Sequence, residues 1–251
     1  MSDLHVRAGR RPTPAVGINR PGWATRETEA LRTVFHDDPV AFRAGRERRR
    51  IIVVEADGEP RGYTTLRRTV DWTTTGPRGT VSTGEVVALD PAAAHRLWST
   101  VLDLDLTHEV EPFMIPVDDP ITGLLVDLRA AAPRAVDNVW VRLVDVAGAL
   151  AARTYTTDLD VVLHVTDDRL PANQGSWRLT ATAFGEASVT RTDDDPDLSL
   201  SVTELGAAYL GGTSLAALAA AGRVEEHTDG ALLRTASAFG WPVAPVCSWV
   251  F

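Results

Sequence analysis

Residues 51–68 constrain the fold more than any other part of this 251-residue chain. An apolar, β-branched run ends at Asp57-Gly58, a strong hairpin signal, and a second strand-like run follows it directly. Further short strands are expected around 70–73 and 80–89, and a later one at 106–113. The sequence therefore predicts an antiparallel meander at the centre of a first domain.

Asp-Pro pairs at Asp38, Asp90 and Asp119 mark expected helix starts. Asp accepts hydrogen bonds from the first backbone amides of a helix, and Pro suits the first helical position. The helix after Asp90 has a clear apolar stripe and should run to about Leu102, and another helix is expected at 25–36. Helices therefore flank the predicted strands.

The pattern changes near Asn138, where we expect a domain boundary. The second domain should hold strands at 140–144, 159–166, 177–183, 186–191 and 198–202, and helices at 147–153, 203–210, 214–221 and 230–239. Residues 1–22 carry prolines and glycines without apolar periodicity, so they are expected to form a disordered or extended lead-in. The predicted organisation is a lead-in (1–22) and two α+β domains (23–138 and 139–251).

Composition narrows the classes of function. A net charge of −9 argues against nucleic acid or an anionic membrane as partner and is compatible with cationic small molecules such as amines. No run approaches the roughly 18 apolar residues of a membrane span, and no signal-like segment opens the chain, so a cytoplasmic protein is expected. The single cysteine permits no intrachain disulfide.

Several residue groups have both a chemical and a structural interpretation. Asp118 and Asp119 could form an acid/base pair, but a helix cap is favoured for Asp119. The arginines at 46–50 could bind CoA phosphates or nucleic acid, although a solvated face or an acidic neighbour in an oligomer is favoured. The acidic run 193–195 is interpreted as an exposed turn, and Cys247 is not favoured as a nucleophile. The histidines show no ligand spacing, so no metal site is predicted.

Ordered strings along residues 20–251 carry a family resemblance. They are Asp57-Gly58 to Gly62-Tyr63, Glu85-Val86, Leu97-Trp98 to Leu106, Pro116 to Pro120, Val139 to Val146, Ala149 to Arg153, and Leu205 to Ser214. In order and spacing they resemble the Eis family of GNAT N-acetyltransferases. The resemblance implies an α+β fold, with a second GNAT-type domain of mixed or antiparallel sheet and helices, followed by a domain like a sterol carrier protein.

The family resemblance implies acetyl-CoA as the co-substrate. Members hold its pyrophosphate with an R/Q-x-x-G-x-G/A string at a helix N-terminus, and that string is not found here. We therefore expect that the N-terminal acetyl-CoA-binding GNAT domain, which also carries the general-acid tyrosine of the family, is absent. The chain would then be either a truncated gene prediction or a naturally short form, inactive as an isolated polypeptide.

The resemblance also assigns a role to Phe251. In this family the carboxylate of a C-terminal phenylalanine acts as the general base that deprotonates the substrate amine, an aminoglycoside or a lysine-type side chain. From the residues alone, an apolar anchor for the tail is the favoured interpretation of Phe251. Val250 stands where some members carry an acidic residue, which puts the substrate range in question. A homo-oligomer is implied as well.

Two other classes of function stay open. The residues from Trp140 onward could form a non-catalytic module that binds a lipid or another apolar ligand. The chain could also be a structural remnant that assembles with a full-length paralogue. Co-purified ligand would favour the first alternative, and co-purified paralogue the second.

Overall fold

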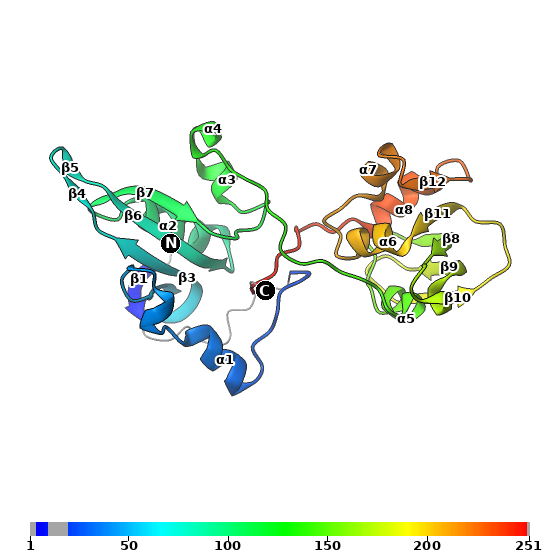
Figure 1. The fold of residues 1–251 in the computed structure, drawn as a ribbon, viewed down its shortest axis with the longest axis horizontal. Helices are drawn as coiled ribbons and strands as arrows, with labels where there is room; N and C mark the ends of the chain where they lie inside the picture. The colour runs from blue at the N-terminus through cyan, green and yellow to red at the C-terminus, as the bar shows by residue number, and fades with distance from the viewer. Residues whose placement is uncertain (1–3, 10–19, 250–251) are drawn as a thin grey trace. The chain divides into compact units, whose positions relative to one another are not determined.

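The computed structural model describes residues 4–9 and 20–249, and it divides the chain into two compact units (Figure 1). Of the described residues, unit 1 comprises 4–9, 20–136 and 246–249, and unit 2 comprises 137–245. The division after residue 136 lies beside the boundary that we expected near Asn138. The expected second domain ran to the end of the sequence, whereas residues 246–249 group with unit 1.

Unit 1 is built on a five-stranded sheet of order β1-β2-β3-β6-β7 (Figure 1). Its strands are β1 (Leu4–Gly9), β2 (Arg50–Ala56), β3 (Glu59–Thr69), β6 (Gly79–Ala88) and β7 (Thr107–Pro112). The predicted hairpin is confirmed, since β2 and β3 pair antiparallel. Asp57 and Gly58 turn the chain with positive φ values of 53° and 81°, as a tight hairpin requires.

Three features of this sheet go beyond the predicted meander. Residues 4–9 form strand β1 against β2, although the whole segment 1–22 was expected to be a disordered or extended lead-in. The third strand is only a minor hairpin of β4 (Trp72–Thr73) and β5 (Gly76–Pro77). β7 pairs parallel with β6, because the helix between them returns the chain to the end of the sheet at which β6 begins.

The helix α2 (Pro91–Leu102) covers one face of this sheet. Asp90 caps it by accepting a 2.8 Å hydrogen bond from the Ala93 amide, as the sequence predicted. Leu97 and Val101 pack with Val54 and Leu66 of the sheet in one apolar cluster. Elsewhere in the described part of unit 1 lie α1 (Glu29–His36), the 3₁₀ turn η1 (Val40–Phe42), α3 (Ile121–Leu124) and α4 (Leu128–Ala131).

The other two Asp-Pro pairs behave differently from each other. Asp119, only 4% exposed, accepts 2.9 Å hydrogen bonds from the Ile121 amide and from Trp98 Nε1, so it holds the start of α3 against α2. Asp38 was predicted to cap a helix, and this is wrong: η1 has no side-chain cap. Its carboxylate instead binds Arg67 of β3, Arg43 and the Arg49 amide, as described below.

Unit 2 has its own five-stranded sheet, of order β10-β9-β8-β11-β12 (Figure 1). The strands are β8 (Leu159–Thr166), β9 (Gly175–Ala181), β10 (Ala187–Arg191), β11 (Leu198–Ser201) and β12 (Val224–Glu226), with β8 and β11 parallel. The helices are α5 (Val146–Ala151), α6 (Val202–Tyr209), α7 (Leu215–Ala220) and α8 (Ala231–Phe239), with a 3₁₀ turn η2 (Pro171–Asn173).

The strand expected at 140–144 does not form. Its apolar alternation places only Leu143 in the core, whereas Trp140 and Val144 are 85% and 74% exposed. The segment instead runs beside α6, where the carbonyl oxygen of Val141 occupies the space that a side chain at Gly206 would need. Close backbone packing therefore replaces strand pairing here.

The interior of unit 2 is one continuous apolar cluster. Leu163, Leu179 and Leu198 of the sheet meet Leu205 and Phe239 of the helices, all of them buried. These side chains form the core between the sheet and the helices. In neither unit do the described residues include a helix that is long and apolar enough to cross a membrane.

Candidate functional site

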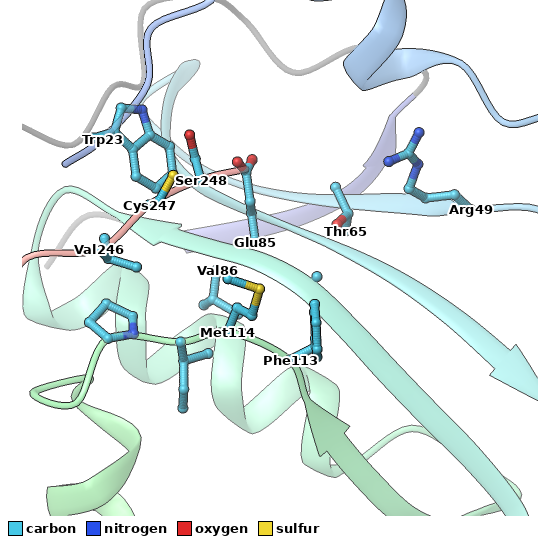
Figure 2. Close-up of a pocket in the computed structure, with 13 residues that line it drawn as sticks. Trp23, Arg49, Thr65, Glu85, Val86, Phe113, Met114, Val246, Cys247 and Ser248 are labelled. Atoms are coloured by element: carbon cyan, nitrogen blue, oxygen red, sulfur yellow. The ribbon is translucent and has the colours of Figure 1, made fainter. Parts of the chain in front are cut away.

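A pocket of about 240 Å³ opens on unit 1 (Figure 2). Its wall combines strand residues, the loop 113–116 that follows β7, and the C-terminal residues 246–248. Figure 2 shows Trp23, Cys247 and Ser248 at one end and Arg49 at the other, with Glu85 between them. The C-terminal segment and the sheet of unit 1 therefore line the same pocket.

A β-bulge aims Glu85 into this pocket. Between the pairs Thr64–Val86 and Leu66–Thr83, strand β3 contributes one residue and β6 contributes two, Gly84 and Glu85. Such an extra residue bends a strand and redirects the neighbouring side chain. The acidic group at the pocket is thus set by the backbone of the sheet itself.

Glu85 holds two partners at once. Tyr63 Oη donates a 2.7 Å hydrogen bond to its Oε2, and Arg26 Nη2 makes an ion pair with its Oε1. The Arg26 and Glu85 side chains are only 14% and 11% exposed, so the pair is largely shielded from water. Burial, followed by the adjacent Glu85 charge, raises the pKa of Tyr63 well above its usual range. Tyr63 is therefore a neutral hydrogen-bond donor at physiological pH.

The C-terminal segment 246–249 lies along residues 21–26. The Val246 amide donates a 3.0 Å hydrogen bond to the Pro21 carbonyl, and Ser248 Oγ donates a 3.1 Å bond to the Ala24 carbonyl. The Arg26 guanidinium lies 5.7 Å from the centre of the Trp249 ring. The tail is thus fastened to unit 1 by backbone and side-chain contacts together.

Two arginines of the run at 46–50 bind acceptors within their own unit. Arg50 pairs with Glu47 at 2.8 Å, and Arg49 Nη2 donates a 2.7 Å bond to the Asp37 carbonyl. Burial first, then the nearby Arg67 charge, lowers the pKa of Arg49. These contacts favour a structural role for Arg49 and Arg50 over binding of nucleic acid.

Asp38 is the centre of this arginine cluster. Its oxygens accept from Arg67 at 2.6 Å and from the Arg49 amide at 3.0 Å, and they lie 3.3 Å from Arg43 Nε. Burial would raise its pKa, but the hydrogen bonds from Arg67 and Arg49 and the two guanidinium charges outweigh it and lower the pKa to about 2. Asp38 is therefore ionised throughout the physiological range.

The candidate residues from the sequence analysis have different outcomes in the structure. Phe251 lies outside the described residues. Cys247 is half-buried in the pocket wall, and Asp194 of the acidic run binds Arg178 and Thr192 in an exposed loop. Among the residues that the structure describes, no group of three His, Cys, Asp or Glu is placed to hold a metal ion.

Sequence reasoning missed Arg26, Tyr63 and Glu85 as site residues. Tyr63 and Glu85 do belong to strings that carried the family resemblance, but those strings gave them no role. The glycine at Gly84, inside a strand, is a known signal of a bulge and could have pointed to Glu85. Arg26 has no comparable signal, because its partners Glu85 and Trp249 lie far away in the sequence.

The N-termini of α1, α2 and α4 in unit 1 do not fit the pyrophosphate of acetyl-CoA. Such an anion needs free amides at a helix N-terminus. The first amides of α2 face the carboxylate of Asp90, those of α4 face Asp127, and those of α1 face the hydroxyl of Thr28, with Glu29 beside it. Acidic side chains therefore occupy or flank the places that phosphate would take.

Comparison with known proteins identifies both units. Residues 22–143 match the acetyltransferase (GNAT) domain, and residues 146–248 match the sterol carrier protein domain. An uncharacterized N-acetyltransferase of Streptomyces avermitilis is 45% identical over 232 residues, which is 92% of this chain and 54% of that protein. N-acetyltransferase Eis of Mycobacterium tuberculosis is 31% identical over 159 residues, or 62% of this chain and 38% of that protein.

Solved structures agree with these matches. Eis1 from Mycobacterium abscessus has a TM-score of 0.66 at 35% identity, over 80% of this chain and 50% of that one. A GCN5-related N-acetyltransferase from Anabaena variabilis shares the fold with a TM-score of 0.70 at 21% identity, over 92% of this chain and 56% of that one. The predicted fold, a GNAT-like sheet with helices followed by a sterol-carrier-like domain, is thus confirmed.

The chain spans about half the length of the curated relatives that it matches. The expected absence of an acetyl-CoA-binding GNAT domain is not confirmed, because the match at residues 22–143 is itself a GNAT domain. GNAT acetyltransferases generally take their acetyl group from acetyl-CoA. The chain carries a GNAT acetyltransferase domain followed by a sterol carrier protein domain, and its relatives are N-acetyltransferases that include Eis.

Proposed function

We propose that this chain takes part in the acetyl-CoA-dependent N-acetylation of an amine, either an aminoglycoside or a lysine-type side chain, in a cytoplasmic homo-oligomer. One observation carries the proposal: the C-terminal segment 246–249 is fastened in the wall of the GNAT-domain pocket. Phe251 follows Trp249 by two residues, and two residues of extended chain reach roughly 7 Å. We propose that the Phe251 carboxylate acts within this reach of the pocket that holds Glu85.

A tethered carboxylate suits the acid/base problem of this reaction. An amine with a pKa of about 10.4 is protonated at neutral pH and cannot attack until a base removes its proton. An α-carboxylate has a pKa of about 3.3 to 3.7 in water, so it must be partly desolvated or act through water to accept that proton. The apolar neighbours Trp23, Met114 and Ile115 in the pocket wall would favour such desolvation.

We further propose that the isolated chain does not bind acetyl-CoA and is inactive alone. The capped N-termini of α1, α2 and α4 and the missing phosphate-binding string support this. Titration of the purified chain with acetyl-CoA in a calorimeter should give no binding heat. Saturable binding would overturn this part of the proposal and would place the co-substrate site within the chain.

The role of Phe251 can be tested in a chimera that joins this chain to the part of the Streptomyces avermitilis relative that it does not match. Release of CoA thiol in the presence of an aminoglycoside measures acetyl transfer. Extending the terminus by two glycines moves the carboxylate and keeps the phenyl ring, so the rate should fall about a hundredfold or more. The control Phe251→Leu keeps the carboxylate and should lose far less.

The two variants separate the interpretations of Phe251. If Phe251 serves only as an apolar anchor, the control variant should lose more activity than the glycine extension. A chimera that binds acetyl-CoA but acetylates neither an aminoglycoside nor a lysine peptide would contradict the proposed substrate class.

A further inference from the structure

We propose that Arg26 is a positioning residue, which fixes the C-terminal segment 246–249 on the GNAT domain and thereby places the terminal carboxylate. The inference rests on the proposed function for its catalytic meaning. The docking itself can be measured without any activity.

Arg26 joins three separate parts of unit 1. Its guanidinium lies 5.9 Å from the Trp23 ring centre and 5.7 Å from the Trp249 ring centre, and it pairs with Glu85 on β6. A planar cation can contact aromatic faces and bind a carboxylate along its edge at the same time. One side chain thus connects the N-terminal segment, the C-terminal segment and the sheet.

Two other contacts of the tail do not have this specificity. The bonds from Val246 to Pro21 and from Ser248 to Ala24 both end on backbone carbonyls, which any sequence would offer. They hold the two segments side by side without reaching the sheet. Arg26 supplies the link to the sheet, through an ion pair whose two side chains are largely shielded from water.

Glu85 makes the link stiff. Its second oxygen accepts the hydrogen bond from Tyr63, a buried residue of the neighbouring strand β3, so the carboxylate is held from two sides. Charge-assisted hydrogen bonds of this kind are stronger than neutral ones. The tail is consequently anchored to the centre of the sheet rather than to a mobile loop.

Cys247 provides a direct readout of docking. It is the only cysteine of the chain and is half-buried in the docked segment. A thiol reagent such as Ellman's reagent therefore reports how often the segment opens. In the isolated chain, Arg26→Met should speed the reaction of Cys247 about tenfold, which corresponds to roughly 1.4 kcal/mol of docking free energy.

Matched variants identify the cause. Arg26→Lys keeps the charge but loses the planar stacking, so an intermediate rate is expected. Trp249→Leu removes the stacked ring while Arg26 and Glu85 remain, and it should also speed the reaction. Arg96→Gln, which changes an exposed arginine on α2 of the same unit, should leave the rate unchanged. Urea unfolding of each variant verifies that unit 1 remains folded.

The chimera tests whether docking acts through the carboxylate. Arg26→Met should lower the acetyl-transfer rate in the chimera with the native terminus. It should have little further effect once the terminus is extended by two glycines, because both changes then remove the same placement of the base. Purely additive effects would show that Arg26 does not act through the terminal carboxylate.

Two failures can be told apart. An unchanged Cys247 rate in both Arg26→Met and Trp249→Leu would overturn the inference, whatever the chimera does. Accelerated Cys247 reaction in a chimera that acetylates no amine would contradict the proposed function and leave the docking role of Arg26 in place.

Discussion

The two units of this chain bury their interiors in different ways. Unit 2 has one continuous apolar cluster that includes residues from strands β8, β9 and β11 and from helices α6 and α8. Unit 1 divides its buried apolar residues between the α2 face of the sheet and a small cluster around Val53, Tyr63 and Val87. Near that small cluster lie the Arg26–Glu85 pair, the Asp38 arginine cluster and the pocket.

This difference affects what the stability of each unit depends on. Hydrophobic burial is non-directional and tolerates many arrangements, whereas buried charges are stable only with partners in good geometry. Unit 2 is therefore expected to be most sensitive to truncation of its core, although it also holds two buried carboxylates, Asp167 paired with Arg142 and Glu204 paired with Arg223. Unit 1 is expected to depend on specific ion pairs, which also makes it the unit suited to bind a polar ligand.

The largest effect is expected from the core of unit 2. Leu205→Ala should lower the free energy of unfolding by about 2 to 5 kcal/mol, because Leu205 is fully buried in α6 and its removal leaves a cavity. Leu233→Ala is the matched control, since this leucine of α8 is 67% exposed and should change stability by less than 1 kcal/mol. Urea unfolding followed by circular dichroism measures both. Equal effects would mean that this core is not tightly packed.

The sequence predicted unit 2 better than unit 1, because a single continuous core leaves a simple burial pattern in each element. Strand β8 and helix α8 follow simple burial patterns against one core, and both were predicted within one residue of their bounds. The strand expected at 140–144 failed because apolar alternation alone does not reveal whether a partner strand is available. Local pattern was sufficient where one apolar face decides the structure.

The site was harder to predict because its contacts are distant in sequence. The Ser248 to Ala24 bond joins residues 224 positions apart, and no periodicity reports such a meeting. Glu85 and Tyr63 lay in strings typical of the family, yet only the bulge in β6 shows that Glu85 faces the pocket. Asp38 matched a helix-cap signal, but the arginines of β3 and of the 43–49 segment compete successfully for its carboxylate.

An intermediate effect is expected at Gly206, where α6 approaches the 140–144 segment. A Cβ at this position would collide with the carbonyl oxygen of Val141, which is backbone and cannot rotate away. Gly206→Ala should therefore cost about 1 to 3 kcal/mol, despite the better helix propensity of alanine. The control Gly123→Ala in α3 meets open space and should be neutral or slightly stabilising. A neutral Gly206→Ala would show that this backbone contact is loose.

The smallest effect, and the one that tests unit 1 directly, is the pH dependence of Asp38. Its pKa of about 2 in the folded protein lies below the ordinary value of 3.8, so the ionised form stabilises the fold. That contribution is fully present above about pH 4 and is lost as the pH falls toward 2. Asp38→Asn should therefore cost about 1 kcal/mol at pH 7, and the difference from wild type should shrink between pH 4 and pH 3.

Urea midpoints at pH 7, 5, 4 and 3 measure this trend, with Asp103→Asn as control for an exposed carboxylate of the same unit. If the stability difference between wild type and Asp38→Asn stayed constant down to pH 3, the charge of Asp38 would not contribute to stability. Asp38 would then act only through the geometry of its hydrogen bonds, which asparagine fails to reproduce at every pH. The charged cluster of unit 1 would lose its electrostatic character in that case.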